Sequence, residues 1–242
     1  MAIIPYLAMT AAEYESTDSL PPRMAWMACH FSPYATGLSN LPSHLPENSM
    51  IIVNDITPIY KHKPEMIAEQ LIKCIEDNHC CAVLLDFQRG ETDTICELTQ
   101  HLLEVLPCPV AVSNTIAARF QCPVFLPPCP LHEPLGEYIG NWSNREIWLD
   151  AALEAETIVL TEKGADYSFC EISSITPDQF HKTHMESDLH CHYTIETSQN
   201  KVTFTLWRNS DDLQNLIQEA EQCGISKIVG LYQELRHNNA VF

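Results

Sequence analysis

The stretch of sequence that decides the fold is AVLLDFQ, residues 82–88. Four apolar residues lead to a carboxylate at Asp86 and an amide at Gln88. A short apolar run of this kind is typical of a parallel strand that is buried on both faces. The carboxyl ends of such strands carry the catalytic groups of barrel enzymes. We therefore expect residues 82–87 to form a central strand that places Asp86 at a reaction face.

Seven other short runs are apolar or rich in β-forming residues, and amphipathic helices separate several of them. The runs are Ile3–Met9, Met24–His30, Met50–Asp55, Pro109–Ser113, Pro123–Leu126, Ile147–Ala151 and Ile228–Tyr232. Helical periodicity follows Pro64, spans Asp93–Leu106, and follows Ser210 as far as Gly224. Eight strands that alternate with helices in 242 residues predict a (β/α)₈ TIM-like barrel, formed by one domain over residues 1–242.

Two departures from this regular pattern are visible in the sequence. Residues 115–121 and 127–145 are too short or too rich in proline for full crossover helices, so some outer helices should be shortened or missing. Residues 156–207 alternate polar and apolar side chains, as in TIVLTE and KVTFTLW. This alternation predicts an inserted or appended antiparallel sheet of hairpins.

Composition excludes several classes of function. A formal net charge of −19 repels nucleic acid and anionic membrane surfaces, and seven scattered glycines offer no phosphate-binding loop, so we expect no cofactor. The eleven cysteines show no disulfide or zinc-finger spacing, which predicts mostly reduced, buried thiols. No basic leader precedes the first apolar segment, and we expect a cytoplasmic protein. Neutral ligands such as oligosaccharides remain compatible with this composition.

Two segments resemble the family-18 glycoside hydrolases. The run from Pro64 through CAVLLDFQR resembles the helix and fourth strand of that family, whose strand ends in a DxxDxDxE signature. KVTFTLWRNSDDLQNLIQEAEQCGISKIVGLY resembles its last strand-helix-strand turn. The resemblance places Asp86 at the last aspartate of the signature, Gln88 at the catalytic glutamate and Leu84 at the preceding aspartate. Because an amide cannot donate a proton to a leaving oxygen, it implies a barrel that has lost this family's chemistry but can still hold a sugar hydroxyl.

Other polar and aromatic residues follow predicted strands and would face the same mouth. If the protein is an active hydrolase, its carboxylates are to be sought among Asp86, Asp55, Asp150 and Glu234. If it binds a saccharide, the candidate contacts are Asp86, Gln88, Asn54, Asn114, Trp148 and Tyr232. Each has a simpler alternative as a turn, cap or core residue. For Arg89 and Glu91 we expect a solvated ion pair of little energetic weight.

The tract HKTHMESDLHCH, residues 181–192, contains four histidines and a cysteine. Imidazole and thiolate are good transition-metal ligands, but the spacing fits no common site, so we expect a polar surface segment and no metal.

Three hypotheses remain open at this stage. The first is a degenerate, non-catalytic barrel that binds a saccharide in a remnant cleft. The second is an active glycoside hydrolase that uses other carboxylates at the mouth. The third is a structural or scaffold protein with no small-molecule site. An open cleft with convergent acids and aromatic side chains would favour the first two, whereas a filled mouth would favour the third.

Overall fold

Eight parallel strands close into a barrel, which confirms the predicted fold. The computed structural model describes residues 2–59, 63–170, 175, 183–198 and 200–236. The barrel strands are β1 (Ile4–Met9), β2 (Met24–Phe31), β4 (Met50–Asn54), β5 (Ala82–Asp86), β6 (Val110–Ser113), β7 (Val124–Leu126), β8 (Ile147–Asp150) and β14 (Lys227–Leu231). They are hydrogen-bonded in that order, and β1 pairs with both β2 and β14, which closes the ring. The strand of residues 82–86 lies between β4 and β6, as predicted.

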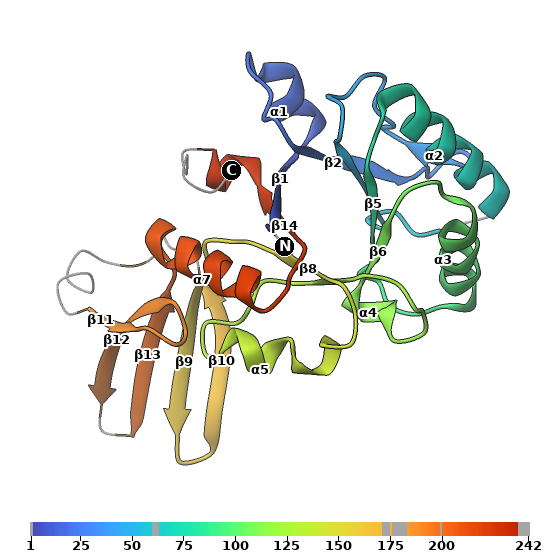
Figure 1. Ribbon diagram of the computed structural model, residues 1–242. Helices are drawn as coiled ribbons and strands as arrows, with labels where there is room; N and C mark the ends of the chain where they lie inside the picture. The colour runs from blue at the N-terminus through green and yellow to red at the C-terminus, as the bar shows by residue number, and fades with distance from the viewer. Residues whose placement is uncertain (1, 60–62, 171–174, 176–182, 199, 237–242) are drawn as a thin grey trace.

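The helices of the outer ring are unequal (Figure 1). Long helices follow β4 and β5, namely α2 (Pro64–Asn78) and α3 (Asp93–Val105), and another, α7 (Ser210–Gln222), precedes β14. Elsewhere the helices are short, as predicted for residues 115–121 and 127–145; they are α1 (Ala11–Ser16), α4 (Asn114–Ala117), α5 (Leu135–Tyr138), the 3₁₀ turn η1 (Gly140–Trp142) and α8 (Tyr232–Leu235). A two-residue strand, β3 (Leu38–Ser39), pairs antiparallel with β2. No helix in the described part of the chain has the length and apolar character that a bilayer crossing needs.

A five-stranded antiparallel sheet is inserted between β8 and α7, which confirms the predicted insertion. Its strands are β9 (Ala155–Thr161), β10 (Gly164–Cys170), β11 (His184–Glu186), β12 (Cys191–Ser198) and β13 (Lys201–Trp207), and their order in the sheet is β10-β9-β13-β12-β11. The sheet projects to one side of the barrel (Figure 1). Its first and last strands along the chain, β9 and β13, are neighbours, so the chain leaves the barrel and returns to it at one point.

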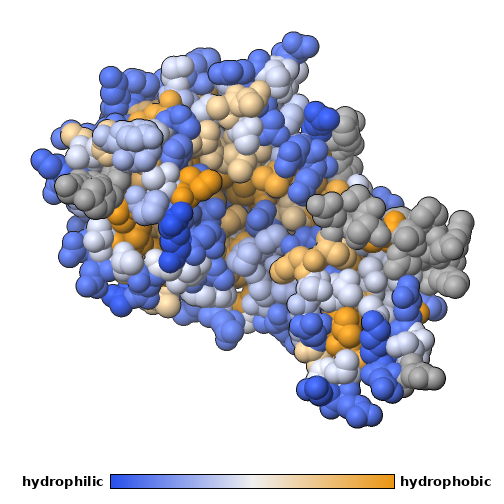
Figure 2. All heavy atoms as spheres, turned by 180° about the vertical axis from the view of Figure 1, so that it is seen from behind, coloured by the Kyte–Doolittle hydropathy of each residue, from blue (hydrophilic) through white to orange (hydrophobic). Residues whose placement is uncertain are grey.

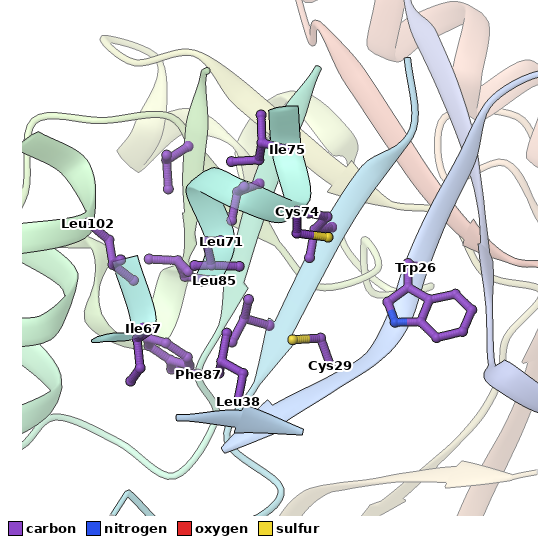
Figure 3. Packing of buried hydrophobic residues seen from close by; sticks show 14 of the residues in the cluster. Trp26, Cys29, Leu38, Ile67, Leu71, Cys74, Ile75, Leu85, Phe87 and Leu102 are labelled. Atoms are coloured by element: carbon purple, nitrogen blue, oxygen red, sulfur yellow. The ribbon is translucent and has the colours of Figure 1, made fainter. Parts of the chain in front are cut away.

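The barrel strands are buried on both faces, and the direction of each side chain follows the strand period of two. On β5, Val83 and Leu85 point outward. They belong to the cluster drawn in Figure 3, together with Phe87 of the loop that follows and with buried residues of α2 and α3 such as Leu71. Ala82 and Leu84 point inward and belong to a second cluster, which fills the interior of the barrel. The same alternation on β4 and β8 decides which polar residues reach the mouth, whereas the register of β2 shifts between Trp26 and Cys29.

Five of the eleven cysteines are buried, namely Cys29, Cys74, Cys80, Cys129 and Cys191. Burial raises the pKa of the Cys80 thiol to about 12, which keeps it protonated at neutral pH. The other six are partly exposed or, for Cys223, exposed, so burial is less general than we expected from the sequence.

Candidate functional site

A small pocket lies at the carboxyl end of the barrel, above the interior cluster. Its volume is about 100 Å³, and its polar lining residues are Asn54, Asp86 and Asp150. These residues end β4, β5 and β8, and each is two positions beyond an inward-facing apolar residue. The parity of the strands therefore brings together three of the residues singled out in the sequence. The remaining lining is apolar and includes Leu84, the position at which the resemblance expects an aspartate.

Asp86, which lines this pocket, forms a hydrogen-bonded pair with Gln88. Gln88 Nε2 donates a hydrogen bond to Asp86 Oδ1 at 2.5 Å, and Thr115 Oγ1 donates to Gln88 Oε1 at 3.3 Å. Burial raises the pKa of Asp86, the hydrogen bond from Gln88 opposes this rise, and the nearby charge of Asp55 adds to it. Both the N–H group and the oxygen of the Gln88 amide are thus hydrogen-bonded. An amide cannot donate a proton as an acid.

Asp55 is not part of the pocket, contrary to the hypothesis that places it among the carboxylates of the mouth. Its side chain is 4% exposed, and its two oxygens accept hydrogen bonds from the backbone N–H groups of Gln88 and Arg89, each at 2.9 Å. Arg89 Nε donates in turn to the carbonyl oxygen of Asp55 at 2.7 Å. Asp55 has the opposite parity to Asn54, so it anchors the loop after β5 instead of facing a ligand.

The expected ion pair between Arg89 and Glu91 does not form. Arg89 donates to the backbone of Asp55 and Ile56, and Glu91 pairs with Arg119. The loop geometry set by Asp55 turns the guanidinium toward β4 and away from Glu91.

Three of the proposed sugar contacts lie away from the pocket. Trp148 is completely buried in the barrel interior, two residues below Asp150, and its Nε1–H donates to Glu146 Oε1 at 2.8 Å. Tyr232 begins α8, has outward parity and packs half-buried against the outer clusters. Asn114 is the first residue of α4 and does not line the pocket. Neither face of the Trp148 ring is open to a sugar.

The opposite side of the mouth carries a group of crowded carboxyls. Burial, together with the charges of Asp86, Glu154 and Glu234, raises the pKa of Asp150 to about 7. Burial also raises the pKa of Glu154 to about 7, although the Arg208 guanidinium opposes this rise. A carboxyl with a pKa near neutrality is a candidate proton donor. Sequence reasoning missed Glu154, although it follows Asp150 by four residues in LDAALE.

A second hollow adjoins this group, between the barrel and the inserted sheet. Its volume is about 530 Å³, and it is lined by residues 152–155, Phe169, Cys170 and Glu234. Phe169 is 76% exposed and offers a bare aromatic ring, while Glu234 accepts a hydrogen bond from the backbone N–H of Leu153 at 3.4 Å. Phe169 was not singled out in the sequence, since one aromatic residue in an alternating strand gives no signal of its own.

Arg208 joins the inserted sheet to the barrel. It is 1% exposed, and its guanidinium donates to the carbonyl oxygens of Cys129, Leu189 and His190 at 3.2–3.4 Å. Its charge lies near Glu154 without forming a direct ion pair in the described part of the chain. Arg208 therefore fixes the position of the sheet relative to the mouth.

The described histidines of the tract 181–192 are engaged separately. His190 Nε2 bonds Glu219 at 2.5 Å, His192 Nδ1 bonds Asp212 at 2.7 Å, and His184 packs against the ring of Tyr193. His181 lies outside the described residues. Among the residues that the structure describes, no three histidine, cysteine or acidic side chains converge as a metal site would require.

The fold and the position of the pocket define a (β/α)₈ barrel with its candidate site at the carboxyl ends of the strands. Solved structures with this fold include the family-18 N-acetylglucosaminidase of Paenibacillus barengoltzii (TM-score 0.59, 8% identity, 94% of each chain covered). Another is a family-18 chitinase of Cycas revoluta, solved as a double mutant in complex with (GlcNAc)₄ (TM-score 0.57, 10% identity, 94% of each chain). A third is the chitinase-like agglutinin of Robinia pseudoacacia (TM-score 0.55, 11% identity, 93% of each chain).

The chain resembles these proteins in structure and not in sequence. No protein-family model matches the chain, and no curated protein matches its sequence. At identities near 10%, the shared property is the fold. The resemblance to family-18 glycoside hydrolases that two sequence segments suggested is thus confirmed for the architecture of the chain.

Proposed function

We propose that this chain is a degenerate glycoside-hydrolase-like barrel that binds an N-acetylated oligosaccharide at its mouth and does not cleave it by the family-18 mechanism. The observation that carries the proposal is the pair of Gln88 and Asp86. The amide stands where the resemblance expects the catalytic acid, and its N–H donates to the carboxylate that would support that acid. The position is thus held in a geometry that accepts and donates hydrogen bonds but transfers no proton.

The size of the pocket indicates how a sugar would lie. The pocket has a volume of about 100 Å³ and mostly apolar walls, which suits a small substituent that carries a methyl group. An acetamido group would fit among its apolar walls, with its N–H toward a carboxylate. The rest of the ligand would lie above the mouth and extend into the hollow beside Phe169, where the exposed ring provides a stacking surface.

Two of the similar structures bear on this proposal. The Cycas revoluta structure contains a glutamate-to-glutamine change together with bound (GlcNAc)₄. The Robinia pseudoacacia protein is described as a chitinase-like agglutinin. In at least one protein with this fold, a glutamate-to-glutamine change is therefore compatible with a bound oligosaccharide.

An active hydrolase is the second candidate, and the raised pKa of Asp150 is the observation that favours it. A carboxyl that titrates near pH 7 could act as an acid while Asp86, in the same pocket, serves as the second carboxylate. The small volume of the pocket speaks against it, because a glycosidic oxygen must reach between the two groups.

Calorimetry with chitotetraose and with a neutral β-glucan oligosaccharide tests the proposal. We expect weak binding of chitotetraose that Asp86→Ala reduces at least fivefold, Phe169→Ala reduces, and Gln88→Glu changes modestly. Glu91→Gln, which alters an exposed ion pair outside the pocket, is the matched control and should bind like the wild type.

Assays with chromogenic chitooligosaccharides and β-glucosides separate the rivals. We expect no turnover by the wild type. Hydrolysis that is lost in Asp150→Asn, and that does not depend on Gln88, would establish the active hydrolase instead. Absence of both binding and turnover for every sugar tested would leave the scaffold hypothesis.

A further inference from the structure

One histidine–carboxylate pair of the tract 181–192 joins the inserted sheet to α7. His192 Nδ1 lies 2.7 Å from Asp212 Oδ2, and the same oxygen accepts the backbone N–H of Asn209 at 3.0 Å. Asn209 Nδ2 lies farther from the ring nitrogen, at 3.5 Å. The side chain of Asp212 is 2% exposed and that of His192 is 25% exposed. Because a carboxylate only accepts hydrogen bonds, it holds the imidazole proton on Nδ1 and leaves Nε2 as an acceptor.

His192 lines a third hollow, which we call the distal hollow, with a volume of about 650 Å³. The residues that line it include Leu153, Met185, His192, Trp207, Asn209 and Ser210. The His192 ring stacks against the Trp207 ring, with centroids 6.0 Å apart. Among the described residues, no hydrogen bond engages His192 Nε2, so this acceptor is available to a ligand in the hollow. In the view of Figure 2, hydrophobic atoms also reach the surface of the projecting lobe to which β11, β12 and β13 belong.

The distal hollow continues the path along which the proposed ligand would leave the mouth. Leu153 lines both the distal hollow and the hollow beside Phe169. Asp150, which lines the pocket at the mouth, precedes Leu153 by three residues, a separation of roughly 11 Å at most. The backbone N–H of Arg208 donates to the carbonyl oxygen of Glu154 at 3.0 Å, which fixes the end of β13 against the same segment. The pocket and the two hollows therefore follow one another from the barrel to the inserted sheet.

The lining of the distal hollow suits a neutral ligand with hydroxyl groups. Leu153, Met185 and Trp207 provide apolar walls beside an imidazole, an amide and a hydroxyl group. An anion is disfavoured because Asp211 and Asp212 occupy the first turn of α7. A cation gains little, since the buried Asp212 oxygen already accepts from two donors. A pyranose ring fits this chemistry, because its C–H face packs on apolar side chains while its hydroxyl groups form hydrogen bonds.

We propose that the distal hollow is a further sugar subsite, in which His192 Nε2 accepts a hydrogen bond from a hydroxyl group of the bound oligosaccharide. The inference rests on the proposed function, because the ligand is the same oligosaccharide whose other end lies at the mouth. Asp212 is a positioning residue, which fixes the tautomer and orientation of the His192 ring without touching the sugar. Only an oligosaccharide long enough to pass Leu153 gains from this contact.

Calorimetry of the full chain with chitotriose and chitohexaose separates the distal hollow from the mouth. The wild type should bind chitohexaose at least fivefold more tightly than chitotriose. His192→Asn should abolish this gain and leave the binding of chitotriose unchanged, because its amide is too short to reach the position of Nε2. His192→Gln has a longer side chain whose amide oxygen can accept there, and it should keep part of the gain.

His190→Asn is the matched control. It removes the other imidazole of the tract that pairs with a carboxylate of α7, Glu219, but residue 190 does not line the distal hollow. Asparagine also tolerates the left-handed backbone of this residue, whose φ is 47°. This variant should bind both ligands as the wild type does.

Nitrogen-15 NMR of the histidine side chains gives a readout that a merely structural role of His192 would not move. Chitohexaose should shift the Nε2 signal of His192 and leave that of His190 unchanged, whereas chitotriose should shift neither.

Three results would overturn the inference. Equal affinities of the wild type for chitotriose and chitohexaose would exclude the further subsite and leave the proposed function intact. Equal losses in His190→Asn and His192→Asn would show that the docking of the sheet on α7, and not a contact with the sugar, sets the affinity. Binding of neither ligand by the wild type would overturn the proposed function together with this inference. Far-ultraviolet circular dichroism of each variant checks that the sheet is retained.

Discussion

The two sides of the barrel mouth use carboxylates in opposite ways. On the side of β4 and β5, Asp55 is saturated by backbone N–H groups and Asp86 accepts from Gln88. On the side of β8 and β14, burial and then the charges of nearby carboxylates raise the pKa of Asp150 and of Glu154 to about 7. The first arrangement stabilises a loop, whereas the second stores unfavourable charge, which is characteristic of sites kept for a ligand or a proton. The comparison can be tested by removing each carboxylate in turn.

The largest effect is expected from Asp55→Ala. Two buried N–H groups of the loop after β5 would lose their acceptor, which should lower the free energy of unfolding by about 3 kcal/mol. Asp55→Asn keeps one acceptor and should cost about half as much. Urea denaturation followed by tryptophan fluorescence measures both. A loss below about 1 kcal/mol for the alanine variant would show that Asp55 is not the anchor of this loop.

Asp150→Asn should raise the free energy of unfolding, and the size of this gain should depend on pH. The pKa of Asp150 is about 7 in the folded chain and about 3.9 in an unfolded one, so the native state keeps the proton longer. The stability of the wild type therefore falls as pH rises from about 4 to 7 and stays low above that range. The variant should lack this loss and be more stable by on the order of 2 kcal/mol at pH 8. Urea titrations at pH 4.5 and 8 decide it, and a gain that is equal at both pH values would contradict the assignment.

Glu154→Gln should act in the same direction with a smaller gain, on the order of 1 kcal/mol at pH 8. The Arg208 guanidinium already stabilises the charged form of Glu154, so less unfavourable energy is released when the charge is removed. Thermal melts at two pH values, with Glu137→Gln on the exposed surface of α5 as control, provide the measurement. A destabilised variant at pH 8 would mean that the attraction of Arg208 outweighs burial.

The smallest effect on stability is expected from Gln88→Glu. The new carboxyl would lose the donor that Gln88 offers to Asp86, and the pKa of both groups should rise through their mutual repulsion. Since residue 88 is exposed, the cost should remain below about 1 kcal/mol. We expect no gain in hydrolysis, because Leu84 still lacks the carboxylate that the family signature has there and catalytic groups act together. A rate increase of more than tenfold on chromogenic chitooligosaccharides would contradict this expectation.

Much of the fold was predictable because buried parallel strands are encoded as short apolar runs. The runs that begin at Met50, Ala82 and Pro109 differ from the observed strands by at most two residues at either end. The helix after Pro64 was recognisable from the spacing of Ile67, Leu71, Cys74 and Ile75, all of which are buried. The two-residue strand β3 has no such signal, since its pairing with β2 depends on a turn and not on a pattern.

The site was predictable only where strand parity was sufficient. The alternation of inward and outward positions along a strand could have shown that the side chains of Asn54 and Asp55 point to opposite faces. It could also have placed Trp148 one layer below Asp150. It could not show that Asp55 would bind N–H groups of a loop that begins more than 30 residues later in the chain. Nor could it give the raised pKa values of Asp150 and Glu154, which depend on charges from three separate segments.

The closure of the ring between β1 and β14 also constrains the time at which the barrel can form during synthesis. Ile4 pairs with Lys227, so one edge of β1 has no partner until nearly the whole barrel sequence has been made. At roughly 5–20 residues per second, that interval lasts on the order of 10–40 s. Throughout it, β1 presents an open edge and an apolar face of Tyr6 and Ala8, both buried in the finished barrel. A nascent chain of this protein is therefore a natural client for chaperones that shield unpaired strands, and its yield should depend on the rate of translation.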